Sequence, residues 1–201
     1  MRCFNQKFLE AWEKRDEKPE DPANTLHRSQ LAVIMIDLDH FKNVNDTVNH
    51  LMGSYVISEV GKLIHSSGII GPEDLGARYG GDEFIIFGHA PFLDGISEKA
   101  EKLRTLIAQT TFTRDSISIK ITGSFGVAWA APIFKGKAED LIKAADYMLY
   151  RSKENGRNKV SSMILEQPIA LDHIIEMPPL PDEVKEYKDQ ESAPKDNGDH
   201  V

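Results

Sequence analysis

Apolar residues recur along this chain with two different periods, and the change of period separates predicted helices from predicted strands. Apolar side chains every three to four positions predict helices over residues 4–12, 48–64, 96–108 and 138–153. Continuous or alternating apolar runs predict strands over residues 31–36, 75–79, 83–87, 117–130 and 160–164. The polar segment 18–30, with Pro19 and Pro22, predicts a loop.

The order of these segments predicts a fold class. Helices and strands alternate around a single sheet, and the pair Gly80-Gly81 between two apolar runs is typical of a hairpin. A hairpin within an alternating pattern favours an α/β (α+β) fold with a mixed or largely antiparallel sheet. Asn155 and Gly156 predict the end of the last helix.

The composition changes after about residue 163. Half of the ten prolines lie beyond this point, and residues 190–199 are mostly acidic, amide or small side chains. Such a segment cannot bury enough apolar surface to offset the loss of chain entropy. We therefore predict one domain over residues 1–163 and an acidic, Pro-rich, disordered tail over residues 164–201. Only the apolar stretch Leu171–Met177 is a candidate for docking.

Charge and cysteine content argue against several classes of function. The net charge is −8, but ten acidic and three basic residues follow residue 160, so the rest of the chain is close to neutral. A neutral body lacks the basic face that binding to a nucleic acid duplex needs. No apolar run is long enough for a transmembrane helix, so we expect no membrane contact. A single cysteine, Cys3, favours a reducing, cytoplasmic setting.

Two short segments concentrate carboxylates at the ends of predicted strands. Asp37 and Asp39 follow the first apolar run, and Asp82 and Glu83 lie at the tip of the hairpin. Asp37 or Asp39 could simply cap a following helix, and the hairpin tip could be an ordinary turn. If the strand end and the hairpin lie side by side, they form the oxygen-rich pocket that Mg²⁺ prefers.

A third segment carries positive charge. Lys153 lies in the last turn of a predicted helix, and Arg157 follows the glycine that ends this helix. A lysine at such a position usually complements the helix dipole. A lysine and an arginine on either side of a glycine turn can also hold phosphate oxygens, the arginine through its planar fork of donors.

Together these segments resemble the GGDEF domains of diguanylate cyclases. The family pattern D-x-D-x-F-K-x-x-N-D is present as Asp37–Asp46, and R-Y-G-G-D-E-F is present as Arg78–Phe84. The pattern S-x-G-V-A is present as Ser124–Ala128, and A-D-x-x-L-Y-x-x-K-x-x-G-R-N as Ala145–Asn158. Four motifs in order argue against chance agreement. The resemblance implies a palm-like domain with a mostly antiparallel five-stranded sheet flanked by helices.

The resemblance also implies a chemistry and a set of residues. Family members join two purine nucleoside triphosphates into a cyclic dinucleotide, and two Mg²⁺ ions (Mn²⁺ is an alternative) assist attack of a 3′-hydroxyl on an α-phosphate. The metal-binding positions match Asp37, the Leu38 carbonyl and Asp82, and Glu83 would aid metal or proton handling. The positions that bind the substrate match Lys42, Asn45, Ser54, Lys153 and Arg157. Because each domain holds one nucleotide, the product requires a homodimer.

One departure from the family pattern concerns the base. Ser54 stands where the family has an aspartate that reads guanine. A carboxylate only accepts hydrogen bonds, which suits the donating edge of guanine, whereas a hydroxyl donates or accepts and fits either purine. Loss of the carboxylate should reduce discrimination by roughly 1.5–3 kcal/mol. The change resembles the hybrid promiscuous GGDEF enzymes, so we expect GTP and ATP as substrates and cyclic AMP-GMP beside cyclic di-GMP. Alternatively, Ser54 only weakens an ordinary diguanylate cyclase.

Two further departures concern regulation and the start of the chain. Many family members carry R-x-x-D before the signature, where the product binds and inhibits. Here Gly71 replaces the arginine and Asp74 remains, so we expect weak product inhibition. Most of the family's opening motif is missing, so we expect that the chain begins inside the domain and that a longer protein carries an upstream sensory or dimerising module.

Two other functions stay open on sequence alone. A catalytically inactive domain that binds nucleotide or a partner protein would fit Ser54 and the shortened start. Inactive relatives often lose the acidic signature, however, and Asp82 and Glu83 are both kept. A nucleotidyl transfer enzyme acting on nucleic acid would use a similar two-metal palm, but the near-neutral body argues against it. An active cyclic dinucleotide synthase fits the residues best.

Overall fold

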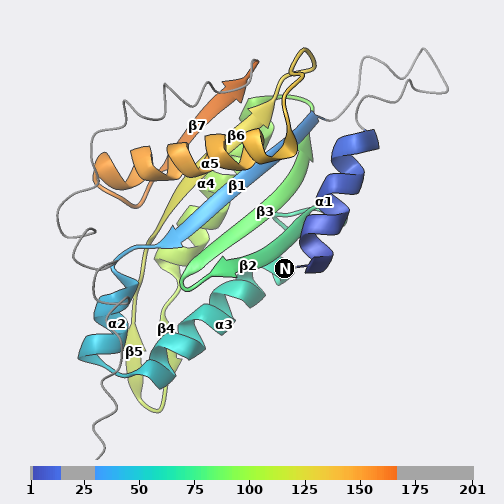
Figure 1. The fold of residues 1–201 in the computed structure, drawn as a ribbon. Coiled ribbons are helices and arrows are strands. Elements are labelled where there is room, and N and C mark those ends of the chain that lie inside the picture. Colours follow the sequence, from blue (N-terminus) through green and yellow to red (C-terminus); the bar gives the residue numbers. More distant parts are fainter. Residues whose placement is uncertain (1, 15–29, 167–201) are drawn as a thin grey trace, which may run out of the picture. The chain divides into compact units, whose positions relative to one another are not determined.

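A computed structural model of the chain describes residues 2–14 and 30–166 (Figure 1). The helices are α1 (Arg2–Lys14), α2 (Phe41–Thr47), α3 (His50–Ser66), α4 (Leu93–Gln109) and α5 (Ala138–Glu154). The strands are β1 (Gln30–Leu38), β2 (Leu75–Gly80), β3 (Glu83–Ala90), β4 (Phe112–Arg114), β5 (Ile117–Ile119), β6 (Gly123–Ala130) and β7 (Val160–Leu165). Within the described ranges, no helix is long and apolar enough to cross a membrane.

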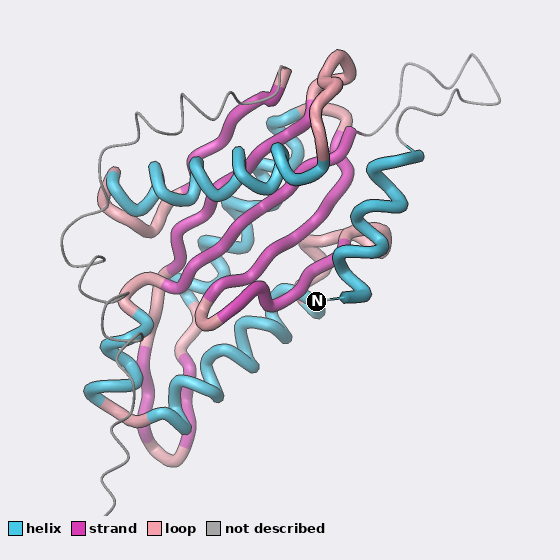
Figure 2. The backbone as a smooth tube through the Cα atoms, in the orientation of Figure 1, coloured by secondary structure: helices cyan, strands magenta, loops and turns pink. Residues whose placement is uncertain are grey.

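A five-stranded sheet in the order β2-β3-β1-β6-β7 forms the centre of the domain (Figure 2). The pairs β2–β3, β3–β1 and β1–β6 are antiparallel, and β6–β7 is parallel. The predicted fold class and the hairpin at Gly80-Gly81 are therefore confirmed. The strand β1 is central, which explains why residues 31–36 are apolar without alternation: both of their faces are covered.

Different helices cover the two faces of the sheet (Figure 1). α3 and α4 pack on one face through residues such as Val56, Val60 and Leu103, which join the main apolar core. α5 lies along the other face, against β1, β6 and β7. A side chain at Gly126 of β6 would overlap the backbone of α5, so the missing Cβ allows this helix to approach closely.

The structure differs from the predicted elements in two places. The expected strand over residues 117–130 is divided, because β5 pairs with β4 in a separate two-stranded sheet. Asp115 and Ser116 form the tight turn between β4 and β5 with φ angles of 48° and 68°, as hairpin turns of two residues require. The short helix α2 was not predicted. The loop before Gln30 and nearly all of the predicted tail lie outside the described residues.

Candidate active site

The carboxylates of two separate segments meet at one end of the central sheet. Asp37, near the end of β1, pairs in register with Glu83, the first residue of β3. The N–H of Leu38 points to the carbonyl oxygen of Asp82 over 3.4 Å, a long contact that closes the hairpin tip against the strand end. The hairpin therefore lies beside the end of β1, as an oxygen-rich pocket requires.

Lys153 reaches this acidic cluster from α5. Its Nζ lies 2.7 Å from Oδ2 of Asp37, and the two side chains are 32% and 15% exposed. Burial raises the pKa of Asp37; the Lys153 charge opposes this rise, and the charges of Asp82 and Asp39 add to it. Burial likewise raises the pKa of Glu83, and the charge of Asp37 raises it further. The cluster therefore holds more negative charge than Lys153 alone balances.

Asp146 of α5 is the aspartate of the A-D-x-x-L-Y motif, and the sequence by itself assigned it no role. Its charge contributes to the raised pKa of Glu83. Although Asp146 is exposed, nearby protein atoms restrict the hydration of its carboxylate, and this raises its pKa. The positive charge of Lys153 lowers the pKa and so opposes part of the rise. Asp146 and Lys153 lie about two helical turns apart, so both can face the end of β1. The spacing of Asp146 and Lys153 within one motif on a predicted helix was the sequence signal that could have identified Asp146.

An arginine fixes the hairpin tip. Nε and Nη2 of Arg78 donate to the carbonyl oxygen of Gly81 over 2.8 and 2.6 Å. Gly81 has a φ of 46°, in the left-handed region that glycine adopts without steric cost. The glycine and the arginine together hold the turn that presents Asp82 and Glu83.

Neither carboxylate that follows the apolar run of β1 caps a helix, so the capping interpretation is wrong. The N-cap position of α2 is His40, which makes no side-chain capping bond. Asp39 is buried and accepts hydrogen bonds from the Thr122 and Ser124 hydroxyls, both over 2.6 Å, and from the Asn158 N–H over 3.0 Å. Asp39 thus links β1, the start of β6 and the segment after α5.

Asn45 and Ser54 form a second group, on α2 and α3. A Cβ at Gly53 would collide with Oδ1 of Asn45, so the Asn45 side chain lies directly against α3. Asn49 begins this helix, and its Oδ1 accepts a hydrogen bond from the N–H of Met52 over 2.8 Å. Ser54 is exposed and follows Gly53 directly. The structure therefore places Asn45 beside the residue that precedes Ser54.

The remaining predicted phosphate contacts flank these two groups. Lys42 is exposed on the first turn of α2. Arg157 is exposed on the segment after α5, and its N–H donates to the carbonyl oxygen of Ser152 over 3.0 Å. Both segments adjoin the end of β1, since α2 follows this strand and Asn158 is bonded to Asp39.

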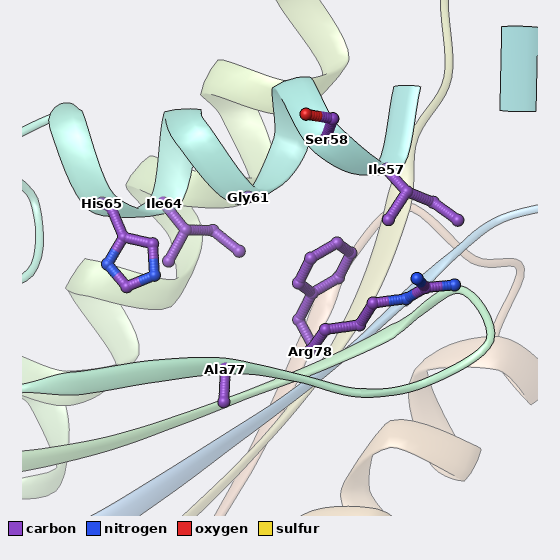
Figure 3. Close-up of a pocket in the computed structure, with 8 residues that line it drawn as sticks. Ile57, Ser58, Gly61, Ile64, His65, Ala77 and Arg78 are labelled. Carbon is purple, nitrogen blue, oxygen red and sulfur yellow. The ribbon is translucent and has the colours of Figure 1, made fainter. Parts of the chain in front are cut away.

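A groove of about 210 Å³ lies between α3 and the hairpin strands (Figure 3). It begins one helical turn beyond Ser54 and extends to Arg78. Its lining residues are Ile57, Ser58, Gly61, Ile64 and His65 of α3, Ala77 and Arg78 of β2, and Phe84 of β3. The groove is largely apolar, which suits the face of an aromatic ring.

Asp74, the retained half of the R-x-x-D pattern, is buried and engaged within the fold. Its Oδ2 lies 2.6 Å from Nζ of Lys99 and accepts a hydrogen bond from the N–H of Gly71 over 2.7 Å. Its Oδ1 accepts a hydrogen bond from the N–H of His89 over 3.2 Å. These bonds account for the aspartate structurally, and weak product inhibition stays a prediction.

Comparison with known proteins identifies the family. The family model described as "Diguanylate cyclase, GGDEF domain" matches residues 2–159, so the chain belongs to this family. The chain is 37% identical to diguanylate cyclase A of Treponema denticola over 134 residues, which are 67% of this chain and 35% of that protein. It is also 37% identical to diguanylate cyclase VdcA of Vibrio cholerae over 134 residues, 65% of this chain and 38% of that protein.

Solved structures of related domains have the same fold. The GGDEF domain of DgcB from Caulobacter crescentus, in complex with c-di-GMP, gives a TM-score of 0.69 at 27% identity, covering 80% of this chain and 88% of that one. The active GGEEF domain of a diguanylate cyclase from Vibrio cholerae gives 0.67 at 28% identity, covering 80% and 94%. The chain thus spans nearly a whole catalytic domain but little more than a third of its curated relatives.

Proposed function

We propose that this domain condenses two molecules of GTP into cyclic di-GMP. The observation that carries the proposal is the convergence of Asp37, Asp82, Glu83 and Lys153 at one strand end in a member of this family. In each of two steps, a 3′-oxygen bonds to the α-phosphorus of the other nucleotide, the bond to pyrophosphate breaks, and the 3′-hydroxyl loses its proton. The second step closes the ring.

The carboxylates fit a magnesium site. Asp37, the carbonyl of Leu38 and Asp82 would hold the metal, and Mn²⁺ is the alternative to Mg²⁺. The raised pKa values of Asp37 and Glu83 reflect burial first and the charges of neighbouring carboxylates second, and a divalent cation would relieve this repulsion. Among the described residues no three acidic, histidine or cysteine side chains form a cage, so phosphate and water oxygens would complete the ligand set. When bound, two such ions supply positive charge at the reacting α-phosphate.

The other residues bind the substrate and handle its proton. Lys42, Lys153 and Arg157 would bind the triphosphate, and substrate binding would exchange the Lys153–Asp37 ion pair for a lysine–phosphate contact. Glu83 has a raised pKa and would accept the proton of the 3′-hydroxyl or assist in holding the cation. Asn45 would contact the base beside Ser54.

Ser54 supports a broader substrate range. The exposed hydroxyl can donate to adenine or accept from guanine, so we propose that ATP also enters the site and that cyclic AMP-GMP forms beside cyclic di-GMP. The apolar groove beyond Ser54 gives either purine ring a surface to pack on, without selecting between them. In this proposal, the choice between GTP and ATP depends on the side chain of residue 54 alone.

The test is chromatography of products after incubation with Mg²⁺ and GTP alone, ATP alone, or both. The wild type should form cyclic di-GMP from GTP and also the mixed dinucleotide from the two together. Ser54→Asp should reduce the share of mixed product at least about tenfold, because it restores a charge-assisted contact to guanine.

Ser66→Asp is the matched control, since it makes the same substitution at the far end of α3, outside the residues that line the groove, and should leave the product ratio unchanged. Cyclic di-GMP as the sole product would overturn the ATP proposal and leave the diguanylate cyclase intact. No product from any mixture, also with a longer and forcibly dimerised protein, would favour a domain that binds nucleotide or a partner without turnover.

A further inference from the structure

The segment after α5 has an unusual backbone. Gly156, Arg157 and Asn158 have φ angles of 101°, 59° and 45°, three successive residues in the left-handed region. Residues other than glycine rarely adopt this region, and two in succession are unfavourable for the isolated chain. Such a backbone persists when surrounding contacts hold it in place.

Asp39 provides one of the contacts that join this segment to the central sheet; directly after the segment, the carbonyl oxygen of Lys159 also accepts from the N–H of Phe125 in β6 over 2.9 Å. The N–H of Asn158 and the Thr122 hydroxyl both donate to its Oδ2, and the Ser124 hydroxyl donates to its Oδ1. Only 5% of Asp39 is exposed, and three donors satisfy its charge. The residue lies two positions after Asp37, whose carboxylate pairs with Lys153.

Two further hydrogen bonds hold the segment from its other sides. The Arg157 N–H donates to the carbonyl of Ser152 over 3.0 Å, which ties the segment to α5. Nη1 of Arg104 donates to Oδ1 of Asn158 over 2.6 Å, which ties it to α4. Neither bond reaches β1, whereas the bond to Asp39 links this segment directly to the strand of Asp37.

We propose that Asp39 is a positioning residue: it holds the left-handed segment against the end of β1 and thereby places Arg157 for the triphosphate. This inference rests on the proposed function, because that function assigns Arg157 to the phosphates. The two acids after the apolar run of β1 then have different tasks. Asp37 serves the cation, and Asp39 acts through a backbone bond on the phosphate-binding arginine.

The test compares binding of a non-hydrolysable GTP analogue with Mg²⁺ and binding of GMP, by calorimetry, in the purified chain. Asp39→Ala should weaken the triphosphate analogue about tenfold and leave GMP nearly unchanged, because misplacing one charge-assisted contact affects the outer phosphates. Asp39→Asn should restore affinity: its amide oxygen can accept from Asn158 and Thr122, and its amide can donate to Ser124.

Asp74→Ala is the matched control for lost stability. Asp74 is also buried and also accepts backbone N–H groups, but at the β2 end of the domain. Asp74→Ala should lower the unfolding midpoint about as much as Asp39→Ala does, without changing the ratio of the affinity for the triphosphate analogue to the affinity for GMP. If Asp39→Ala does not fold, Asp39→Ser replaces it, since a serine keeps a polar group and is too short to reach Asn158.

A double-mutant cycle tests the route through Arg157. In the Arg157→Ala background, Asp39→Ala should cause little further loss of triphosphate affinity, because both changes remove the same contact. Fully additive losses, or equal losses for triphosphate and GMP, would overturn the positioning role. Binding by Asp39→Asn as weak as binding by Asp39→Ala would also overturn it. If the wild type binds neither nucleotide, the proposed function itself fails, which is a distinguishable outcome.

Discussion

Burial and neighbouring charges together set the acidity of single residues at the end of β1 and at the hairpin tip. Asp37 and Glu83 lie opposite each other in register; burial raises the pKa of both, and the charge of Asp37 raises the pKa of Glu83 further. Lys153 offsets part of this charge through its ion pair with Asp37. Carboxylates whose pKa values are raised in this way are common at functional sites.

The first residue-scale prediction concerns Glu83. Its pKa is raised in the folded state, so the folded protein binds this proton more tightly than the unfolded chain does. Stability contributed by this group is therefore greatest below the ordinary glutamate pKa and falls as the pH rises through the raised value. Glu83→Gln should raise the unfolding midpoint at pH 7 by about 2 °C, a small gain because the side chain is partly hydrated.

Thermal unfolding followed by circular dichroism measures this gain. It should disappear at about pH 4, where the wild-type side chain is protonated as well. Glu73→Gln is the control, since Glu73 is exposed and away from the acidic cluster, and it should leave the midpoint unchanged. An unchanged or lower midpoint for Glu83→Gln at pH 7 would contradict a destabilising charge at this position.

At the scale of elements, the close packing of α5 on β6 fixes the position of the last turn of α5, after which the left-handed segment Gly156–Asn158 follows. Ser152, one residue before Lys153, donates to the carbonyl oxygen of Phe125 over 2.7 Å. Gly126 makes this approach possible because it offers no side chain to the helix. The position of Lys153 thus depends on a residue that has no chemical role of its own.

We predict that Gly126→Ala lowers the free energy of unfolding by about 3 kcal/mol, since the new methyl group overlaps the backbone of α5 rather than a flexible side chain. Urea denaturation measures the loss. Gly61→Ala on α3 is the matched change: the nearest atom to its Cβ would be a ring carbon of Phe84 at 3.8 Å. It should be neutral or stabilise by up to about 1 kcal/mol through helix propensity. Equal effects of the two substitutions would argue against close packing at Gly126.

At the scale of the whole molecule, the proposed reaction needs two domains, because each domain would hold one nucleotide beside one acidic cluster. The chain covers about a third of the two curated relatives. In the isolated chain, encounter of two copies should then limit turnover.

We therefore expect the specific activity to rise with protein concentration, and the initial rate in dilute solution to scale with about the square of the concentration. Initial rates of pyrophosphate release across a dilution series measure this dependence. Fusion to a dimeric coiled coil is the control and should make the specific activity independent of dilution. A constant specific activity in a chain that light scattering shows to be monomeric would contradict a requirement for two domains.

Local periodicity and motif spacing were sufficient to predict most of the fold. The apolar run of residues 31–36, the hairpin at Gly80-Gly81 and the amphipathic helix over 138–153 each depend on neighbours in sequence, and all three are confirmed. The same local information placed Asp37 at a strand end and Asp82 at a turn. Their proximity was already a hypothesis, because the oxygen-rich pocket that Mg²⁺ prefers requires the strand end and the hairpin to lie side by side.

Contacts between distant segments decided the rest. The sequence left open that Asp37 or Asp39 caps a helix, yet the partners of Asp39 are Thr122, Ser124 and Asn158, which lie 83, 85 and 119 residues away. Asp146 joins the acidic cluster only because α5 packs on the face that carries Asp37. A sequence pattern shows which side of a helix or strand is apolar, but not which other element covers it. Packing of the whole domain decides which elements meet, and it therefore decided which residues surround Asp39 and Asp146.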